Sequence, residues 1–198
     1  YYTFISDTIL INNRIGLLAD ASTSIFAINT EMRVNSMGIL MYNSYACYFT
    51  NCLLEANFAH YSPNIDFDKS PEASAGIALT LKNCQNVNFS NCYFEAHLVT
   101  AVLYSSQSNV FSNCIFVPAA GDFMVGALIL PYLVWFYGND ASNNKFINNF
   151  YLSSNEDLSR SHKFFTHFRN TSTGNVFELT TKEQLDLFIS QNPDEFTE

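Results

Sequence analysis

The chain has 198 residues, 48% of them hydrophobic and 16% aromatic, which is enough for one domain with a substantial core. Nine Lys and Arg stand against 18 Asp and Glu, and this net charge of −9 argues against a nucleic-acid partner, because phosphate binding depends on clustered positive charge. The longest apolar stretch, 124–138, contains Pro131 and is too short to span a bilayer, so no membrane insertion is expected.

The chain carries no pattern of a targeting segment or a bound cofactor. It starts at Tyr1 without an initiator Met or a signal-peptide pattern, and we expect a fragment of a longer protein. Its five cysteines include no Cys-x-x-Cys pair, so neither a zinc site nor any other cofactor is expected.

A motif of the form Phe-x-Asn-Cys recurs along the chain, and its flanking positions recur with it. Taking the Asn as position zero, its equivalents are Asp7, Asn29, Asn51, Asn91, Asn113 and Asn148. The spacings of 22, 22, 40, 22 and 35 residues amount to one period of 22 with insertions of 18 and 13. Position −2 holds Ile5, Ala27, Phe49, Phe89, Phe111 and Phe146; position +1 holds Thr8, Thr30, Cys52, Cys92, Cys114 and Asn149; position +3 holds Leu10, Met32, Leu54, Phe94, Phe116 and Tyr151.

This period is too short for a pair of helices and is rich in β-branched and aromatic residues, so it predicts a solenoid with one β-coil per repeat. Coils stacked about 4.8 Å apart would turn each column into a ladder of like side chains. Asn at position zero suits a sharp left-handed turn, and stacked Asn can bond along the column. Positions −2, +1 and +3 are expected to point inward, with the cysteines as free buried thiols.

The ladder of Asn with inward Phe and Cys or Thr resembles the pectate-lyase-like right-handed parallel β-helix, and especially the bodies of bacteriophage tailspikes. The resemblance covers residues 1–152 and implies an all-β fold, a right-handed parallel β-helix of about six to seven coils. Tailspike-like proteins associate as parallel trimers, so it also implies a homotrimer. Because this fold hosts lyases, hydrolases, esterases and purely structural spikes, the resemblance identifies an architecture better than an activity.

Each coil is expected to hold three strands. The first strand covers 16–20, 38–42, 76–81 and 101–105, the second leads into position zero, and the third follows it. A seventh, degenerate copy at 174–179 would end a β-helix spanning 1–179. The remaining residues, 180–198, form a capping helix at 180–190 and a tail, since Thr180 and Glu183 match a capping box and such a helix could cover the last open edge.

The inserted residues all follow the third strand, at 56–75, 117–131 and 153–163, and would leave the solenoid at one corner. Insertions gathered on one face either build a binding surface or pad a subunit interface. The first strand is apolar at nearly every position, so its outer face is apolar as well. Monomers seldom expose such strips, so either the loops or another subunit should cover them.

Position +4 predicts a pair of outward carboxylates. Glu55 and Glu95 share this column on adjacent coils, with Arg33 just beyond Glu55. Paired carboxylates serve glycoside hydrolysis as acid and as nucleophile or base, and a separation of roughly 5 Å fits a retaining mechanism. These three residues are therefore the predicted catalytic group. An ordinary surface ion-pair ladder of little energetic value explains the same residues.

Other side chains are candidates for contacts with a sugar. His97 follows Glu95 by two residues, in a column with Asn13, Asn35 and Asn57. The first insertion offers Tyr61 and Phe67 as stacking platforms, and Asp66, Asp68 and Glu72 as rival acids. Trp135 is interpreted either as a sugar platform or as part of the core.

Other chemistries find less support in the residues. A lyase would need a basic group, for which Arg14, Arg33 and Lys69 are the nearest candidates, and no match to the aspartate cluster of the pectate-lyase calcium site is found. The acids of 64–72 lack the spacing of a known calcium loop, so no metal is expected. No Gly-x-Ser-x-Gly motif occurs, which leaves an esterase unsupported.

We therefore expect part of a phage tailspike or similar virion spike, acting outside the host cell. The hypothesis is that it binds host-surface polysaccharide and, in its stronger form, cleaves it, by hydrolysis rather than by a lyase reaction. Two alternatives stay open: a non-catalytic structural or receptor-binding spike, and a secreted bacterial polysaccharide lyase or hydrolase that acts as a monomer.

Overall fold

The computed structural model describes residues 2–57, 76–97, 99–117, 132–137, 141–151, 165–168 and 176–179, with 132–137, 151, 165–168 and 176–179 described by their backbone alone. All regular elements within these residues are β-strands. No helix in this part of the chain is long and apolar enough to cross a membrane. The predicted capping helix at 180–190 and nearly all of the three predicted insertions lie outside the described residues.

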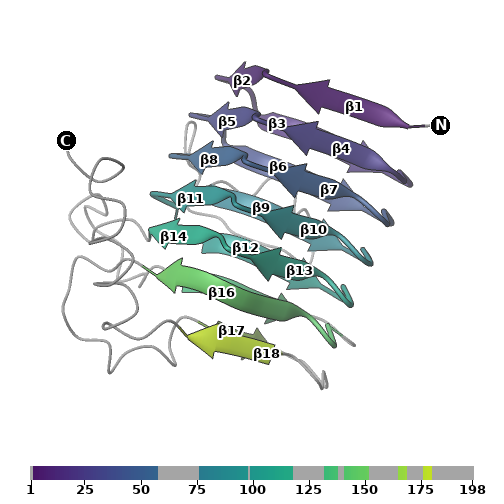
Figure 1. Ribbon diagram of the computed structural model, residues 1–198, viewed down its shortest axis with the longest axis vertical. Helices are drawn as coiled ribbons and strands as arrows, with labels where there is room; N and C mark the ends of the chain where they lie inside the picture. Colours follow the sequence, from purple (N-terminus) through teal and green to yellow (C-terminus); the bar gives the residue numbers. More distant parts are fainter. Residues whose placement is uncertain are drawn as a thin grey trace.

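The strands fall into three rows, which Figure 1 shows stacked level upon level from the N-terminus. The first row is β1 (Thr3–Ser6), β4 (Ile25–Ile28), β7 (Tyr48–Thr50), β10 (Asn88–Ser90), β13 (Val110–Ser112), β16 (Lys145–Tyr151) and β18 (Val176–Leu179). The second row is β2 (Ile9–Ile11), β5 (Glu31–Arg33), β8 (Leu53–Glu55), β11 (Tyr93–Glu95) and β14 (Ile115–Val117). The third row is β3 (Ile15–Asp20), β6 (Met37–Tyr42), β9 (Ile77–Lys82), β12 (Val99–Tyr104), β15 (Tyr132–Tyr137) and β17 (Phe165–Phe168).

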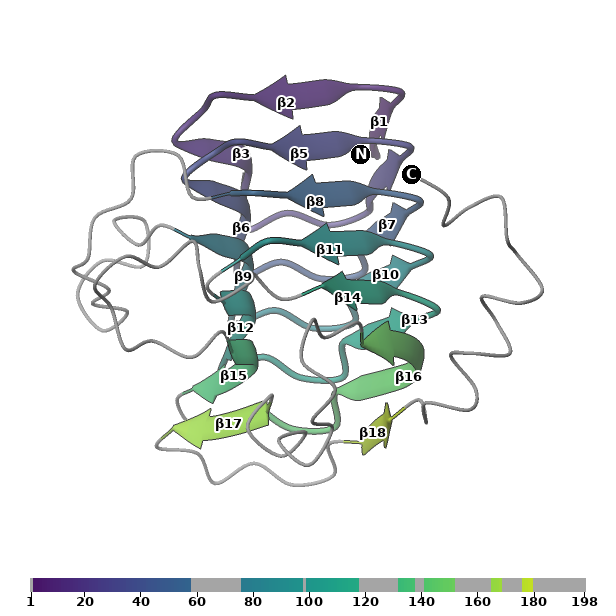
Figure 2. The ribbon, with the colours of Figure 1, turned by 90° about the vertical axis from the view of Figure 1, so that its left-hand side faces the viewer.

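All of these strands pair in parallel with their neighbours in the row. The long strand β16 joins the first and second rows into one 12-stranded sheet, and the third row forms a six-stranded sheet. Figure 2 shows the rows on different sides of one stack. Parallel strands in curled sheets around a shared interior are compatible with a parallel β-helix.

The pairing register follows the 22-residue period of the sequence. Ile5 lies opposite Ala27, for example, and Phe89 opposite Phe111. In the degenerate copy near the end, Phe177 of β18 pairs with Phe146 of β16, but the register then shifts, and Leu179 pairs with Asn149. The repeat predicted these partners because in-register stacking places equivalent side chains next to each other.

The columns at −2, +1 and +3 point inward, as predicted. Phe49, Phe89, Phe111 and Phe146 are fully buried and stack with centroid separations of 4.7, 4.9 and 4.5 Å. The Phe94 and Phe116 rings of position +3 stack alongside at 4.9 Å. Stacked aromatics add to the burial of their own apolar surface, so these columns form the centre of the core.

Position zero adopts the predicted left-handed turn in all six repeats, with φ between 50° and 53°. The outward side chains form the expected ladder at its start, where Asn29 Nδ2 donates to Asp7 Oδ1 at 3.1 Å and Asn51 Nδ2 donates to Asn29 Oδ1 at 3.4 Å. The sharp turn that Asn tolerates therefore sets the corner between the first and second rows.

A second apolar cluster lies on the outer side of the third row. Its members are fully or almost fully buried: Met37, Leu40, Ile77, Val99 and Val102. At the first level of the same face Leu18 remains 58% exposed. The third row holds the strands that the sequence analysis placed first in each coil. Their predicted apolar outer face is thus buried within this chain at the middle levels.

Candidate functional site

The predicted carboxylates lie on the outer face of the second row. In β8 and β11 the middle residues, Leu54 and Phe94, are buried, so the flanking residues of each strand face outward. Glu55 pairs directly with Glu95, and Arg33 of β5 pairs with Glu55 on the other side. Parallel neighbours lie about 4.8 Å apart, so the register places the two half-buried carboxylates side by side.

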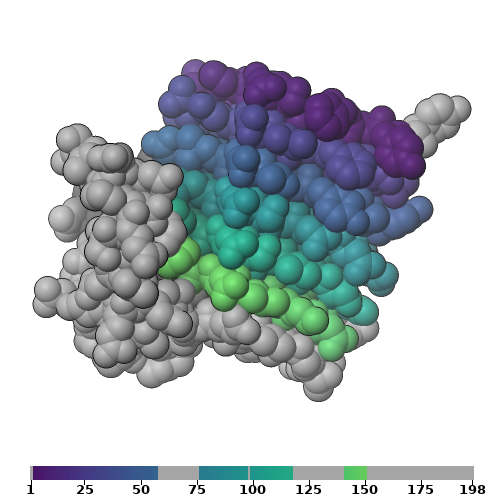
Figure 3. Space-filling model, in the orientation of Figure 1, coloured from purple at the N-terminus to yellow at the C-terminus, as the bar shows by residue number. Residues whose placement is uncertain are grey.

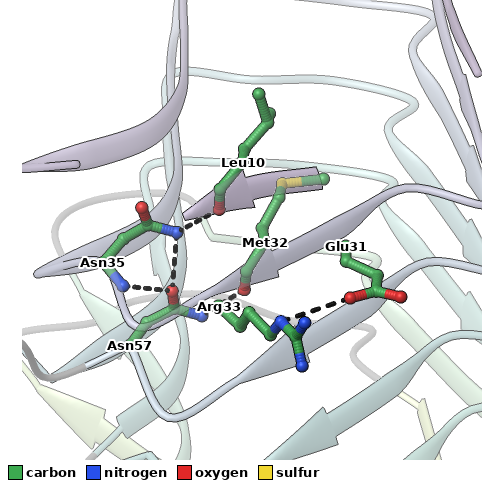
Figure 4. A network of polar contacts seen from close by, with 6 residues as sticks. All are labelled: Leu10, Glu31, Met32, Arg33, Asn35 and Asn57. Atoms are coloured by element: carbon green, nitrogen blue, oxygen red, sulfur yellow. Dashed lines mark hydrogen bonds and ion pairs between the residues drawn. The ribbon is translucent and has the colours of Figure 1, made fainter. Parts of the chain in front are cut away.

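Arg33 makes its ion pair with an acid outside the predicted catalytic group. Its Nε lies 3.3 Å from Oε2 of Glu31, two residues earlier on the same face of β5, as Figure 4 shows. The two side chains are 40% and 37% exposed, and a pair this open to water contributes little stability. Glu31 is thus a further member of the charged group, beside the predicted trio.

Tyr93 completes the group, although the sequence analysis gave it no role in the site. Burial, followed by the charge of Glu95, a side-chain hydrogen bond with Glu95 and the charge of Glu55, raises the pKa of Tyr93 to about 12. Tyr93 therefore keeps its proton at neutral pH and acts as a donor to the Glu95 carboxylate. The signal in the sequence was its i, i+2 spacing from Glu95, which puts both on one face of the strand.

His97, which the sequence predicts as a sugar contact, lies in the interior of the structure. The ring is 1% exposed, and its Nε2 lies 3.1 Å from Nδ2 of Asn57 in the interior. Burial lowers the pKa of His97 to about 3, so the ring is neutral at physiological pH. Its position in a column with Asn35 and Asn57 is confirmed, but that column faces inward.

The remaining predicted sugar contacts cannot be placed beside the carboxylates. Tyr61, Asp66, Phe67 and Asp68 lie outside the described residues, as do Lys69 and Glu72. Trp135 is located in β15, opposite Val102 of β12, by its backbone alone. On the described surface Arg33 lies next to Glu55 on one side of the pair, and Val117 lies next to Glu95 on the other. Apolar residues of the same face lie around this group: Leu53, Ile115, Ile9 and Ile11.

The cysteines have no catalytic character. All five are buried free thiols, as predicted for Cys52, Cys92 and Cys114 at position +1. A hydrogen bond with Cys92, together with burial, raises the pKa of Cys52, and burial raises the pKa of Cys84 to about 11. A thiol that resists ionisation is a poor nucleophile and a poor metal ligand. Among the described residues, no group of three or more His, Cys, Asp or Glu is arranged to hold a metal ion.

The chain was compared with family models, curated proteins and solved structures, and none of them matches it. The geometry of the second row is therefore the basis for a functional proposal. It offers two neighbouring carboxylates, a tyrosine donor to one of them, and an Arg–Glu ion pair one strand away.

Proposed function

We propose that this chain is part of a tailspike-like right-handed parallel β-helix of about six to seven coils that binds surface polysaccharide and hydrolyses it. The observation that supports the proposal is the direct pairing of Glu55 with Glu95 on the outer face of β8 and β11. Neighbouring strands about 4.8 Å apart suit the spacing of roughly 5 Å between the carboxyl groups of retaining glycosidases.

The contacts suggest which carboxyl takes which role. Tyr93 keeps its proton on the same face of β11 as Glu95 and would orient the Glu95 carboxylate as a donor, so Glu95 is the proposed nucleophile. Glu55 is then the proposed general acid, which protonates the leaving oxygen and later activates the water. Arg33 is engaged by Glu31 and is proposed to act only through the local charge balance.

A homotrimer on the virion surface belongs to the same proposal. The outer face of the first row carries an aromatic column at position −3, and Figure 3 shows this side uncovered at the upper levels. Phe4 is 66% and Tyr48 41% exposed, and the Phe26 and Tyr48 rings stack at 5.2 Å. Soluble monomers seldom expose a contiguous apolar strip, so two further copies are the proposed cover.

One contact favours a second candidate, a non-catalytic structural or receptor-binding spike. Arg33 pairs with Glu31 rather than with the carboxylate pair, as in an ordinary ladder of surface charges. In that case polysaccharide would be bound without being cut. The two candidates share the fold and the trimer and differ only in turnover.

The test is incubation with a panel of bacterial surface and plant polysaccharides, following reducing ends and ultraviolet absorbance together. Hydrolysis gives reducing ends without absorbance. Glu55→Gln and Glu95→Gln should then each lower the rate roughly 100- to 10,000-fold, whereas the matched control Glu31→Gln should leave it nearly unchanged. Binding without either signal would support the non-catalytic spike, and both signals together would indicate a lyase.

The trimer is tested by the molar mass from light scattering. Wild type and the control Asn88→Ser, from the same column lower in the first row, should have three times the chain mass. The double variant Phe4→Ser, Tyr48→Ser should shift to smaller species. A monomeric wild type would contradict the trimer and would favour a secreted enzyme that acts alone.

A further inference from the structure

A ladder of buried asparagines runs through the turn between the second and third rows and meets a histidine. Main-chain N–H of Asn13 donates to Asn35 Oδ1 at 2.9 Å, and Asn35 N–H donates to Asn57 Oδ1 at 3.2 Å. One level further on, the column holds His97, whose Nε2 lies 3.1 Å from Asn57 Nδ2. Asn35, Asn57 and His97 are all 0–1% exposed, so their polar atoms depend on one another.

The bonds of Asn57 fix the orientation of its amide. Oδ1 accepts two bonds from Asn35, from the main-chain N–H and from Nδ2 at 3.0 Å. Nδ2 donates to the Met32 carbonyl at 2.8 Å, as Figure 4 shows. A flipped amide would face donors with its nitrogen and a carbonyl with its oxygen, so the flip is excluded.

This orientation determines the tautomer of His97. Asn57 Nδ2 is a donor, so the Nε2 atom opposite it must accept and carries no hydrogen. The proton of the neutral ring is therefore on Nδ1, a buried atom with no hydrogen-bond partner among the described residues. Among the described residues the ring therefore makes a single hydrogen bond, and it can make this bond only while Nε2 is unprotonated.

Charged groups on the surrounding strands do not compensate a proton on this ring. The titratable side chains there include Glu55 on β8, Lys82 on β9, Tyr93 and Glu95 on β11, and Tyr104 on β12. Burial lowers the pKa of His97 to about 3, and no charged group among the described residues contributes appreciably to this shift. Glu55 and Glu95 lie on the outer face, whereas His97 points inward.

We propose that His97 is an acid-sensitive lock in the asparagine ladder. While neutral, it accepts from Asn57 and holds the amide in register. Protonation places an N–H on Nε2 against the N–H of Asn57, replaces a hydrogen bond with two opposed donors, and buries a charge with no partner. The ladder around Asn35 and Asn57 then opens. The proposal is independent of whether the protein acts on polysaccharide.

The sign of the effect follows from the two states of the chain. The unfolded chain takes up a proton at the ordinary His pKa of 6.5, whereas the folded chain takes it up only near 3. The lock is therefore intact above pH 6.5 and is lost progressively as the pH falls toward 3. At pH 5 the ratio of unfolded to folded molecules should exceed its value at neutral pH by about 30-fold from this residue alone.

The test compares wild type with His97→Asn, which extends the asparagine column by one level, in urea unfolding between pH 7.5 and 4.5. At neutral pH the variant should be at least as stable as wild type. Between pH 7.5 and 5 the folding equilibrium constant of wild type should fall about 30-fold more than that of the variant, because all carboxylates are common to both. Parallel curves would overturn the proposal.

A measurement on the wild type alone keeps the proposal open to disproof should the variant fold poorly. Nitrogen-15 NMR of the imidazole should show a protonated Nδ1 and an unprotonated Nε2 that stay unchanged from pH 8 to pH 5. A proton on Nε2, or titration of the folded ring near pH 6.5, would overturn it. Amide exchange at Asn13 and Asn35, corrected for intrinsic rates, should accelerate with acid relative to that at Cys114, whose N–H bonds to Asn149 at 2.8 Å.

Discussion

The interior holds two asparagine ladders at two different turns, and comparing them shows what shapes each one. Between the second and third rows, Asn35 donates through N–H and Nδ2 to Asn57 Oδ1 at 3.2 and 3.0 Å. Before the first row, Asn109 donates through the same two groups to Asn144 Oδ1 at 3.1 and 2.9 Å. In both ladders the accepting residue also donates from its Nδ2 to a main-chain carbonyl: Asn57 to that of Met32, and Asn144 to that of Ser106. Identical geometry at two corners indicates a property of the stacked turn itself.

The two ladders differ in the residues that precede them. Each ladder position follows a residue with left-handed φ, between 53° and 58° at Asn86, Ser108 and Asn143, and between 48° and 59° at Asn12, Val34, Ala56 and Ala96. Asn tolerates this region, whereas Val and Ala are strained in it. The first ladder therefore keeps the same geometry although its turn residues have a lower preference for the left-handed region. Of the two ladders described here, it is the one whose column includes a histidine, His97. Stacking on neighbouring levels outweighs local propensity here.

Removing the amide of Asn57 or of Asn144 tests whether the two ladders are equivalent, and it is expected to cause the largest loss of stability. Asn57→Leu and Asn144→Leu each remove at least three hydrogen bonds to buried groups of other residues, and each should lower the free energy of unfolding by roughly 3–5 kcal/mol. Urea denaturation at neutral pH measures both. A cost below about 1 kcal/mol for one of them would break the comparison, because that ladder would then be dispensable.

A smaller effect should follow from crowding the first ladder without removing a bond. A Cβ at Gly38 would lie 2.5 Å from the carbonyl oxygen of Ala78 and 3.0 Å from Nδ2 of Asn57. Gly38→Ala should therefore cost about 1–3 kcal/mol and speed amide exchange at Asn35. Ala78→Gly, at the equivalent position one level on, is the control: it should cost only about 0.5–1 kcal/mol and leave that exchange unchanged. Equal exchange in the two variants would contradict the crowding.

The sequence predicted the columns well because they repeat with the chain. The inward Phe column and the left-handed Asn at position zero both follow from the 22-residue period, and so does the pairing of Glu55 with Glu95. In-register stacking translates sequence spacing directly into spatial neighbours. The aromatic column that begins at Phe4 carried the same signal and could have been found in the same way.

What the period could not supply was the direction of side chains after a turn, or the partner of a flexible one. Ala96 has φ 56°, which breaks the strand alternation and turns His97 inward, so counting by twos from Glu95 gave the wrong face. Arg33 chooses Glu31 on its own strand over Glu55 on the next, a rotamer choice that spacing does not encode. Contacts with the insertions and the helix at 180–190 stay predictions.

The smallest expected effect concerns the strained turn of the first ladder. Val34 is β-branched and 39% exposed, yet its φ is 54°, in a region that such residues rarely adopt. Val34→Asn copies the residue found at Asn12, the same turn one level earlier, and should raise the free energy of unfolding by about 1 kcal/mol. Val34→Thr keeps the β-branch while adding a polar group, so it separates backbone strain from exposed apolar surface. If the free energy of unfolding rose equally in both variants, the added polar group on the surface would be the cause. A rise in Val34→Asn alone would show that the native turn carries backbone strain, which the hydrogen bonds of the ladder offset.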